Sequence, residues 1–494
     1  MKKPPAVLGL WLSLCLIALA PAAGRGSGKT YPVAAVGDID AALEQASPGD
    51  RIVMKNGLWA NARIRFRAMG TADAPIRLSA ETPGRVILTG SSSLSLGGSH
   101  LVVEGLLFQD TAPTAEKAEA VISFRTDSRT QAQDCRVTDC AIIDFSPPDK
   151  KVDTRWVSLY GLRNRVDHCA FHNKTNLGTT LVVWLNKPAE HQPNYHRIDH
   201  NYFGPRTPVG MNGAETIRIG DSATSMQVSR TTVESNYFYR CNGEGEIISN
   251  KSCENVYRGN TFVECEGALT LRHGNRSTVE GNFFLGNGAR LTGGVRVIGE
   301  DQRVVNNYFA DLAGDDSRSA LTFMEGIKDS PLSGYFQVKN ALVAFNTFVN
   351  NKHNFNFGEG AGRDRQTMPP VRCKVANNLV VGKTAPLVVV HDPAAEIRFE
   401  GNLMYGAELG IPPCPGIRQL DPRLEKGSDG LWRPAPDSPA LGAAEGSFFN
   451  VSEDMDGQKR TGKLDVGADQ RSNEPIQCRP LTPKDVGPSW PTLP

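Results

Sequence analysis

The 494-residue chain has no excess of charge of either sign, and most of it contains no long apolar run. It carries 54 lysines and arginines against 53 aspartates and glutamates, a formal net charge of +1. This balance gives no reason to expect a nucleic acid or a membrane surface as a partner. Beyond residue 20 no apolar run is long enough to cross a bilayer as a helix, so we expect no membrane span after that point.

The one long apolar run, residues 6–20, lies near the N-terminus. Two lysines precede it, and the small residues of Ala20-Pro-Ala22 follow it. A basic start, a short apolar core and a small-residue end are typical of a secretory signal peptide. The pattern predicts a signal peptide over residues 1–23 and a secreted or periplasmic protein.

Cysteine is scarce, and its spacing does not favour a metal site. Nine cysteines follow the predicted signal peptide, an odd number, and none of their spacings is that of a zinc site. Cys241 and Cys265 are 24 residues apart, at equivalent places in successive repeats. Stacked core thiols are the expected arrangement, and a disulfide is the alternative.

The most informative feature present is a repeated phrase, an asparagine followed two residues later by phenylalanine or another apolar residue. It begins at Asn201, Asn236, Asn260, Asn282, Asn307, Asn346, Asn378 and Asn402. The shorter intervals are 22 to 25 residues, a period that indicates an array of stacked supersecondary units. The recurrent asparagine predicts an internal ladder of side-chain amides, with exposed turn residues as the alternative.

Each repeat has the residue pattern of short strands. Apolar residues alternate with a period of two, as in Ile217/Ile219 and Leu269/Leu271, and turn-forming residues separate the runs. About 23 residues suffice for three strands and three turns, one coil of a parallel β-helix. A leucine-rich repeat has a similar length, but its leucine spine is missing here.

The repeat predicts an all-β, single-domain parallel β-helix over residues 51–419. Residues 24–50 are expected to cap its start, with a helix from Asp38 to Ser47 and Asp38 as N-cap. Residues 420–494 are proline-rich and are expected to shield the last coil, because an open β-helix end is prone to aggregate.

Superposing the coils predicts a charged panel on one outer face. The alignment places one apolar residue per coil inward: Ile219, Ile247, Leu271 and Val297. The neighbours that would then face outward are Arg218, Glu244, Glu246, Thr270, Arg272 and Arg296. Solvated surface charge is the alternative reading, but so many opposite charges on adjacent strands favour a functional site.

The panel suits one type of chemistry. Glu244, Glu246 and the amide oxygen of Asn212 are hard oxygen ligands that fit Ca²⁺. Such an ion neutralises a uronate carboxylate and acidifies the proton on the adjacent carbon. Lys251, beside the cation and the arginines, is the expected base. Arg272 is expected either to stabilise the enolate-like intermediate or to protonate the leaving oxygen. This combination predicts β-elimination.

Three segments resemble polysaccharide lyase family 6, the alginate lyases and chondroitinase B. They are Asn212-Gly-Ala-Glu-Thr-Ile-Arg-Ile-Gly220, Glu244-Gly-Glu-Ile-Ile-Ser-Asn-Lys-Ser252 and Leu269-Thr-Leu-Arg-His-Gly-Asn275. The resemblance implies a right-handed parallel β-helix, Asn212, Glu244 and Glu246 as calcium ligands, Lys251 as base and Arg272 as acid. It also implies that His273 and Arg296 contact the substrate. Glu215 is the alternative ligand to Asn212.

The long intervals after Asn307 and Asn346 predict loops that leave the helix and set specificity. Their charged residues are Glu325, Lys328, Lys352, His353, Arg363 and Arg365. We expect Arg363 and Arg218 to bind an anionic polysaccharide, alginate first and dermatan sulfate as the alternative.

Two other functions remain open. A pectin-type hydrolase would need paired carboxylates that activate water, which the lysine and arginines do not suit. A non-catalytic carbohydrate-binding β-helix would need no base. Asp454-Met-Asp-Gly resembles the start of a calcium loop but lacks its final glutamate, so it predicts a structural turn.

Overall fold

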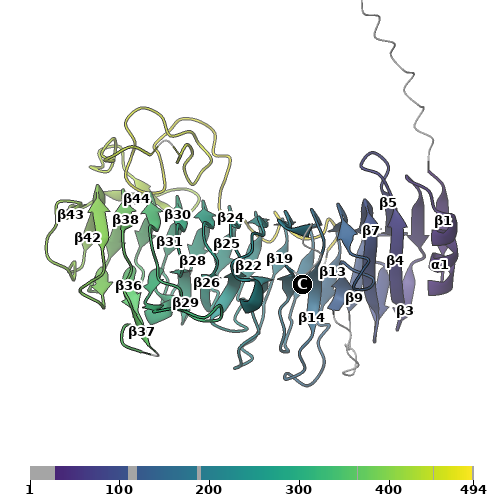
Figure 1. The fold of residues 1–494 in the computed structure, drawn as a ribbon. Helices are drawn as coiled ribbons and strands as arrows, with labels where there is room; N and C mark the ends of the chain where they lie inside the picture. Colours follow the sequence, from purple (N-terminus) through teal and green to yellow (C-terminus); the bar gives the residue numbers. More distant parts are fainter. Residues whose placement is uncertain (1–27, 110–119, 186–190, 364, 449, 492–494) are drawn as a thin grey trace, which may run out of the picture.

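The computed structural model describes residues 28–109, 120–185, 191–363, 365–448 and 450–491. The predicted signal peptide lies outside these described residues. Figure 1 shows strands stacked along one axis, from β1 and α1 at one end to β42 and β43 at the other. Three long sheets, parallel throughout, form the walls, so the predicted parallel β-helix is confirmed.

Sheet A has 14 strands. In spatial order they are β1 (Thr30–Val33), β2 (Arg51–Met54), β5 (Ile76–Ala80), β8 (Leu101–Glu104), β12 (Arg136–Thr138), β15 (Arg165–Asp167), β18 (Arg197–Asp199), β21 (Thr232–Glu234), β24 (Val256–Arg258), β27 (Thr278–Glu280), β30 (Arg303–Val305), β34 (Leu342–Ala344), β38 (Cys373–Ala376) and β41 (Ile397–Glu400).

Sheet B also has 14 strands. They are β3 (Gly57–Ala60), β6 (Val86–Thr89), β9 (Leu106–Gln109), β13 (Ala141–Ile143), β16 (Ala170–His172), β19 (Tyr202–Phe203), β22 (Tyr237–Tyr239), β25 (Thr261–Val263), β28 (Phe283–Leu285), β31 (Tyr308–Ala310), β35 (Thr347–Val349), β39 (Leu379–Gly382), β42 (Asn402–Gly406) and β43 (Ile417–Arg418).

Sheet C has 13 strands and carries the charged panel. They are β4 (Arg63–Met69), β11 (Ala132–Gln133), β7 (Ser93–Ser99), β10 (Ala120–Ser123), β14 (Arg155–Leu159), β17 (Leu181–Val183), β20 (Ile217–Gly220), β23 (Glu246–Lys251), β26 (Gly267–His273), β29 (Thr292–Val297), β32 (Leu321–Met324), β36 (Phe355–Glu359) and β40 (Val388–Val390).

The remaining elements are short. Two antiparallel pairs lie outside the walls: β33 (Gly326–Ile327) with β37 (Gln366–Met368), and β44 (Leu424–Lys426) with β45 (Trp432–Pro434). The helical elements are α1 (Val36–Gln45) and the 3-10 turns η2 (Ser222–Thr224) and η3 (Asp316–Arg318). No helix among the described residues is long and apolar enough to cross a membrane.

The repeated asparagines form the predicted internal ladder. The backbone N–H of each asparagine from Asn201 to Asn378 donates to the side-chain oxygen of the next one at 2.9–3.0 Å. All eight asparagines are buried. The phenylalanines two positions later stack inside, with ring centres 4.5–4.9 Å apart from Phe203 to Phe348. The amide ladder therefore satisfies the buried turns while the rings fill the core.

The thiols and the N-terminal cap differ in part from expectation. Cys241 donates its backbone N–H to the sulfur of Cys265 at 3.4 Å, and both are free, so the stacked thiols are confirmed and the disulfide is not formed. Helix α1 begins two residues before Asp38, whose carboxylate accepts hydrogen bonds from the N–H groups of Ala34 and Ala35. Strand β1 precedes the helix and pairs with β2, so the sheet begins earlier than predicted.

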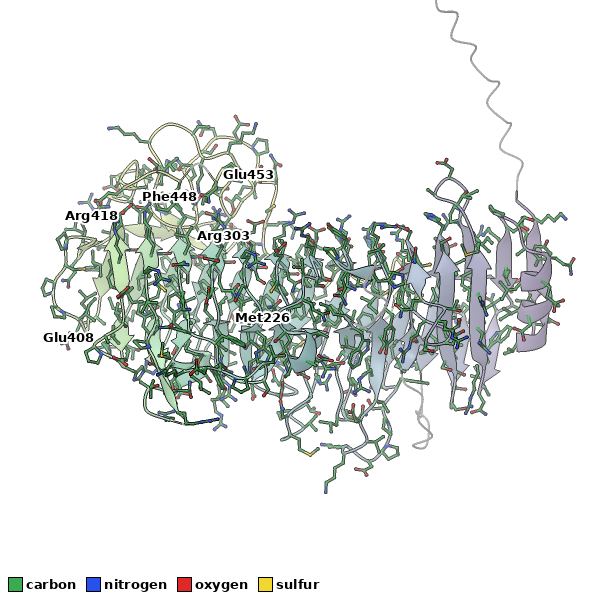
Figure 2. All side chains as sticks on the ribbon, viewed as in Figure 1. Met226, Arg303, Glu408, Arg418, Phe448 and Glu453 are labelled. Atoms are coloured by element: carbon green, nitrogen blue, oxygen red, sulfur yellow. The ribbon has the colours of Figure 1, made fainter. Side chains whose placement is uncertain are left out.

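The C-terminal tail runs along the side of the helix. Phe448 and Val451 pack on the coil that contains Phe345, and Val486 packs far back along the chain near Tyr202. Figure 2 shows Phe448 and Glu453 in the tail, above Arg303 on the coil surface. Residues 407–416 rest against the last coil instead, through Leu409 and its neighbours. The tail thus packs along the side of several coils as well as on the last ones.

Candidate functional site

Three carboxylates from two successive coils meet on the outer side of sheet C. Glu215 precedes β20, Glu244 lies in the turn before β23, and Glu246 begins β23. One oxygen atom from each lies within 4.8 Å of the others. Glu215 is buried, and the other two are partly buried.

The register of β23 differs from the predicted alignment. Ile219 pairs with Asn250, and Asn250 with Leu271, so Ile247 is not in that column. A bulge at Ile247, together with two adjacent buried isoleucines, hides the alternation in the sequence. Ser249 therefore stands beside Arg218 and Thr270, where Glu246 was expected.

The bulge gives Glu246 its place at the start of the strand. Asn250, on the same strand, lies in the inward-facing column with Ile219 and Leu271 and places a polar side chain inside the core. Tyr257 and Asn255 donate hydrogen bonds to the Asn250 side-chain oxygen, each at 2.7 Å. The Asn250 amide donates to the His273 carbonyl at 2.8 Å. This buried network fixes β23 and the end of β26 relative to each other.

The carboxylates are poorly satisfied by the protein. Gly213 donates its N–H to Oε2 of Glu244 at 3.2 Å. The other Glu244 oxygen and Oε2 of Glu215 are buried and have no hydrogen-bond partner among the described residues. Burial, followed by repulsion from Glu215 and Glu246, raises the pKa of Glu244 to about 8. Orphaned hard oxygens of this kind fit a divalent cation such as Ca²⁺.

Cationic side chains face the carboxylates from the adjoining strands. Lys251 Nζ lies 3.8 Å from Glu215, and Arg272 Nε lies 3.8 Å from Glu246. Arg296 Nη1 lies 3.5 Å from the same Glu246 oxygen. The predicted panel therefore exists, with Glu215 as an additional member.

Arg272 and His273, at the end of β26, both have lowered pKa values. Burial, aided by Arg296, lowers the pKa of Arg272. Burial, then the charges of Arg272 and Lys251, lower the pKa of His273 to about 3. His273 is therefore neutral near pH 7, and its ring Nδ1 lies 3.4 Å from Arg272 Nη1.

The predicted loop after Asn307 covers the arginines, through residues that the sequence did not single out. Arg272 donates to the carbonyls of Gly334 at 2.8 Å and Ser333 at 3.2 Å. Arg296 donates to the Tyr335 hydroxyl at 2.9 Å. The only available signal was that residues 333–335 lie in the long interval between Asn307 and Asn346. That interval and the next one leave the helix as predicted, and their strands β33 and β37 pair with each other outside the three walls.

Arg206 also supports the site, and nothing in the sequence indicated this role. It is buried and donates to the Glu215 carbonyl at 3.3 Å and to Thr180 Oγ1 at 2.8 Å. Burial lowers its pKa to about 10. Arg206 holds the segment that carries Glu215, so it positions one wall of the acidic cluster.

The other predicted site residues are spread along the same region. Asn212 is exposed on the loop before β20, next to Gly213, which bonds Glu244. Arg218 lies one strand from Ser249, with its guanidinium 5.1 Å from the centre of the Trp184 ring. Arg363 is not brought to the cluster: it follows β36 and pairs with Glu359 at 3.1 Å.

The chain matches known proteins over most of its length. The family description Chondroitinase B matches residues 33–449. The alginate lyase AlyGC, of polysaccharide lyase family 6, is 39% identical over 94% of this chain and 59% of its own, with a TM-score of 0.82. A mannuronic acid-specific family 6 lyase from human gut microbiota is 34% identical over 80% of this chain and 91% of its own, with a TM-score of 0.72.

A third solved structure is similar at lower identity. The family 6 polysaccharide lyase Pedsa3628 from Pseudopedobacter saltans is 27% identical over 93% of this chain and 99% of its own, with a TM-score of 0.69. This chain thus spans about 59% of the length of AlyGC but nearly all of Pedsa3628. No curated protein sequence matches it.

Proposed function

Since this chain belongs to the Chondroitinase B family, polysaccharide lyase family 6, we propose that it cleaves an anionic uronate polymer by calcium-assisted β-elimination. The observation that carries the proposal is the carboxylate cluster of Glu215, Glu244 and Glu246 facing Lys251 and Arg272. Hydrolysis would need a carboxylate pair that activates water, and here cations surround the carboxylates.

The calcium ligands are proposed as Glu244 and Glu246, joined by Glu215 or Asn212. Glu215 is supported by its buried, unpartnered oxygen within the cluster, and Asn212 by its place beside Gly213 on the adjoining loop. A bound Ca²⁺ would neutralise the substrate carboxylate and acidify the proton on the carbon next to it.

The protein groups then divide the proton transfers. Lys251, in its neutral form, takes the proton from the carbon next to the carboxylate. Arg272 donates a proton to the glycosidic oxygen as the carbon–oxygen bond breaks and a carbon–carbon double bond forms. No water is consumed. Neutral His273 and cationic Arg296 flank these two groups and are proposed to bind the substrate.

Alginate is the proposed substrate, because AlyGC and the gut enzyme are described as an alginate lyase and a mannuronic acid-specific lyase. Dermatan sulfate is the second candidate, since the matching family is named for chondroitinase B.

The test is ultraviolet absorbance of the unsaturated uronate released from alginate and, in parallel, from dermatan sulfate. Wild type, Lys251→Ala and the control Lys374→Ala are compared, each with calcium and with chelator. Lys374 pairs with Glu400 on sheet A and should keep full activity. A calcium-dependent rise lost only in Lys251→Ala supports the proposal. Turnover that Lys251→Ala retains would overturn the mechanism, and no turnover on any uronate polymer would favour a binding protein.

Export through cleavage of residues 1–23 is proposed as well, which would place the enzyme in the periplasm or outside the cell. N-terminal sequencing of protein recovered from those compartments is the test, and an N-terminus at Met1 would contradict it.

A further inference from the structure

A column of stacked arginines and aromatic rings lies on sheet C beside the acidic cluster. The Arg125 guanidinium lies 3.9 Å from the centre of the Tyr160 ring. The Tyr160 and Trp184 rings are stacked with centres 6.0 Å apart, and Arg218 lies 5.1 Å from the Trp184 ring. Arg155 joins the column at 5.6 Å from Trp184. These five residues are called the arginine–aromatic column below.

The column runs towards the proposed site of cleavage. Its members follow or belong to β10, β14, β17 and β20, and β20 pairs with β23, which carries Lys251. Neighbouring strands are about 4.8 Å apart, so Trp184, just after β17, lies roughly two strand spacings from the coil of Lys251. The column thus extends the charged panel towards the N-terminal coils.

Two of its arginines keep unused hydrogen-bond donors. Nε of Arg155 and Nε of Arg218 are buried and have no hydrogen-bond partner among the described residues. Arg155 pairs with Asp153 at 3.1 Å through Nη2, and its side chain is 22% exposed. Both guanidinium groups lie within cation–π distance of the Trp184 ring, a contact that restrains them and lowers the entropy lost when they bind a planar carboxylate.

The opposite end of sheet C has a different charge. Beyond Arg296 the outer positions of β32 and β36 are Thr322 and Asn356, which are uncharged. Next to them lie Glu359 and the buried Glu325, whose two carboxylate oxygens have no hydrogen-bond partner among the described residues. Glu359 pairs with Arg363 and His391, so the cations at that end are already neutralised. Arg155 and Arg218 in the column instead each keep a donor for a polyanion that is unpaired among the described residues.

We infer that the bound polymer extends from the cleavage point over the N-terminal coils, where Arg155, Trp184 and Arg218 form a subsite for the carboxylate of a distal uronate residue. This inference rests on the proposed function, because it assumes an anionic glycan on sheet C. It adds a direction to that function: affinity grows with the length of the chain on one side of the cleavage point.

The test is calorimetric binding of mannuronate oligosaccharides of defined length to the Lys251→Ala protein, so that turnover does not interfere. Arg155→Ala and Trp184→Leu are added separately to this background. The matched control is Arg398→Ala, an exposed arginine on sheet A paired with Glu400. Arg363→Ala tests extension towards the opposite end. Thermal unfolding of each variant verifies the fold.

The longest oligosaccharide should bind more tightly than the shortest one, and Arg155→Ala should remove that gain, a loss of roughly tenfold. Trp184→Leu should act in the same direction, and Arg398→Ala should have no effect. A loss in Arg363→Ala without a loss in Arg155→Ala would overturn the inference and leave the proposed function standing. Absence of binding by any uronate oligosaccharide would overturn both.

Discussion

The guanidinium of Arg272 lies 4.3 Å from the centre of the Tyr335 ring, although the two residues belong to different coils. The Tyr335 hydroxyl accepts a hydrogen bond from Arg296, so one side chain contacts both arginines that flank Glu246. The loop of Tyr335 is also tied to the turn after β20, where the Ser225 hydroxyl lies 3.5 Å from the Leu332 carbonyl. Tyr335 is therefore placed to orient both arginines.

Substitutions of Tyr335 should separate these two contacts. Tyr335→Phe removes the hydrogen bond to Arg296 but keeps the ring on Arg272, so we expect KM to rise several-fold with kcat nearly unchanged. Tyr335→Ala removes both contacts and should lower kcat roughly tenfold. Steady-state kinetics on alginate provide the measurement. Leu332→Ala, an exposed change in the same loop, is the control, and identical kinetics for all three variants would contradict the role of the ring.

Calcium should stabilise the protein more at alkaline than at acidic pH. The pKa of Glu244 is raised to about 8, mainly by burial, so its neutral form favours folding, and that contribution is lost as the pH rises through this value. Calcium replaces the proton on the carboxylate. We expect the calcium-induced rise in Tm to be larger at about pH 8.5 than at about pH 5, measured by scanning fluorimetry with a chelator as reference. The difference between the two calcium-induced rises should shrink in Glu244→Gln. An equal rise in Tm at both pH values would show that calcium does not compete with a proton at Glu244.

Removing one rung of the amide ladder should be costly. The Asn260 side chain accepts the N–H of Asn236 and donates to the Val233 carbonyl, all in the buried interior. Asn260→Ala leaves both groups unpaired, at roughly 1–3 kcal/mol for each. Denaturant unfolding should show this loss, whereas Asn473→Ala, at an exposed position in the tail, should stay within about 0.5 kcal/mol of wild type. A comparable stability for the two variants would mean that the ladder contributes little.

The end of the tail should stabilise the N-terminal coils. The indole of Trp490 donates to the Asp139 carbonyl at 3.1 Å, and its ring fills the space where any side chain at Gly84 would lie. Trp490→Ala should therefore lower the free energy of unfolding by roughly 1–3 kcal/mol. Lys484→Ala, exposed in the same tail, is the matched control. Unchanged unfolding of the Trp490 variant would show that the contact is not stabilising.

Much of the charged panel was predictable because its residues sit within the repeat. Glu244, Glu246, Lys251 and Arg272 lie on β23 and β26 or just before them, where each coil follows the last with a nearly constant period. The alignment of Ile247 was wrong, since hydrophobic periodicity does not reveal a bulge at Ile247 when the next residue, Ile248, is also a buried isoleucine. In the sequence Glu215 is only an alternative ligand to Asn212, and the fold brings its carboxylate into the cluster.

The sequence by itself determined the coil, because an asparagine ladder and alternating apolar residues are local, repeated signals that each coil must satisfy with its neighbours. Only the tertiary structure decided where the excursions go: Tyr335 over Arg272, Arg206 beneath Glu215, Arg363 away from the cluster, and the tail along the side of the coils. The physical reason is that a loop or a tail has no period of its own, and its path depends on contacts with residues that are distant in the chain.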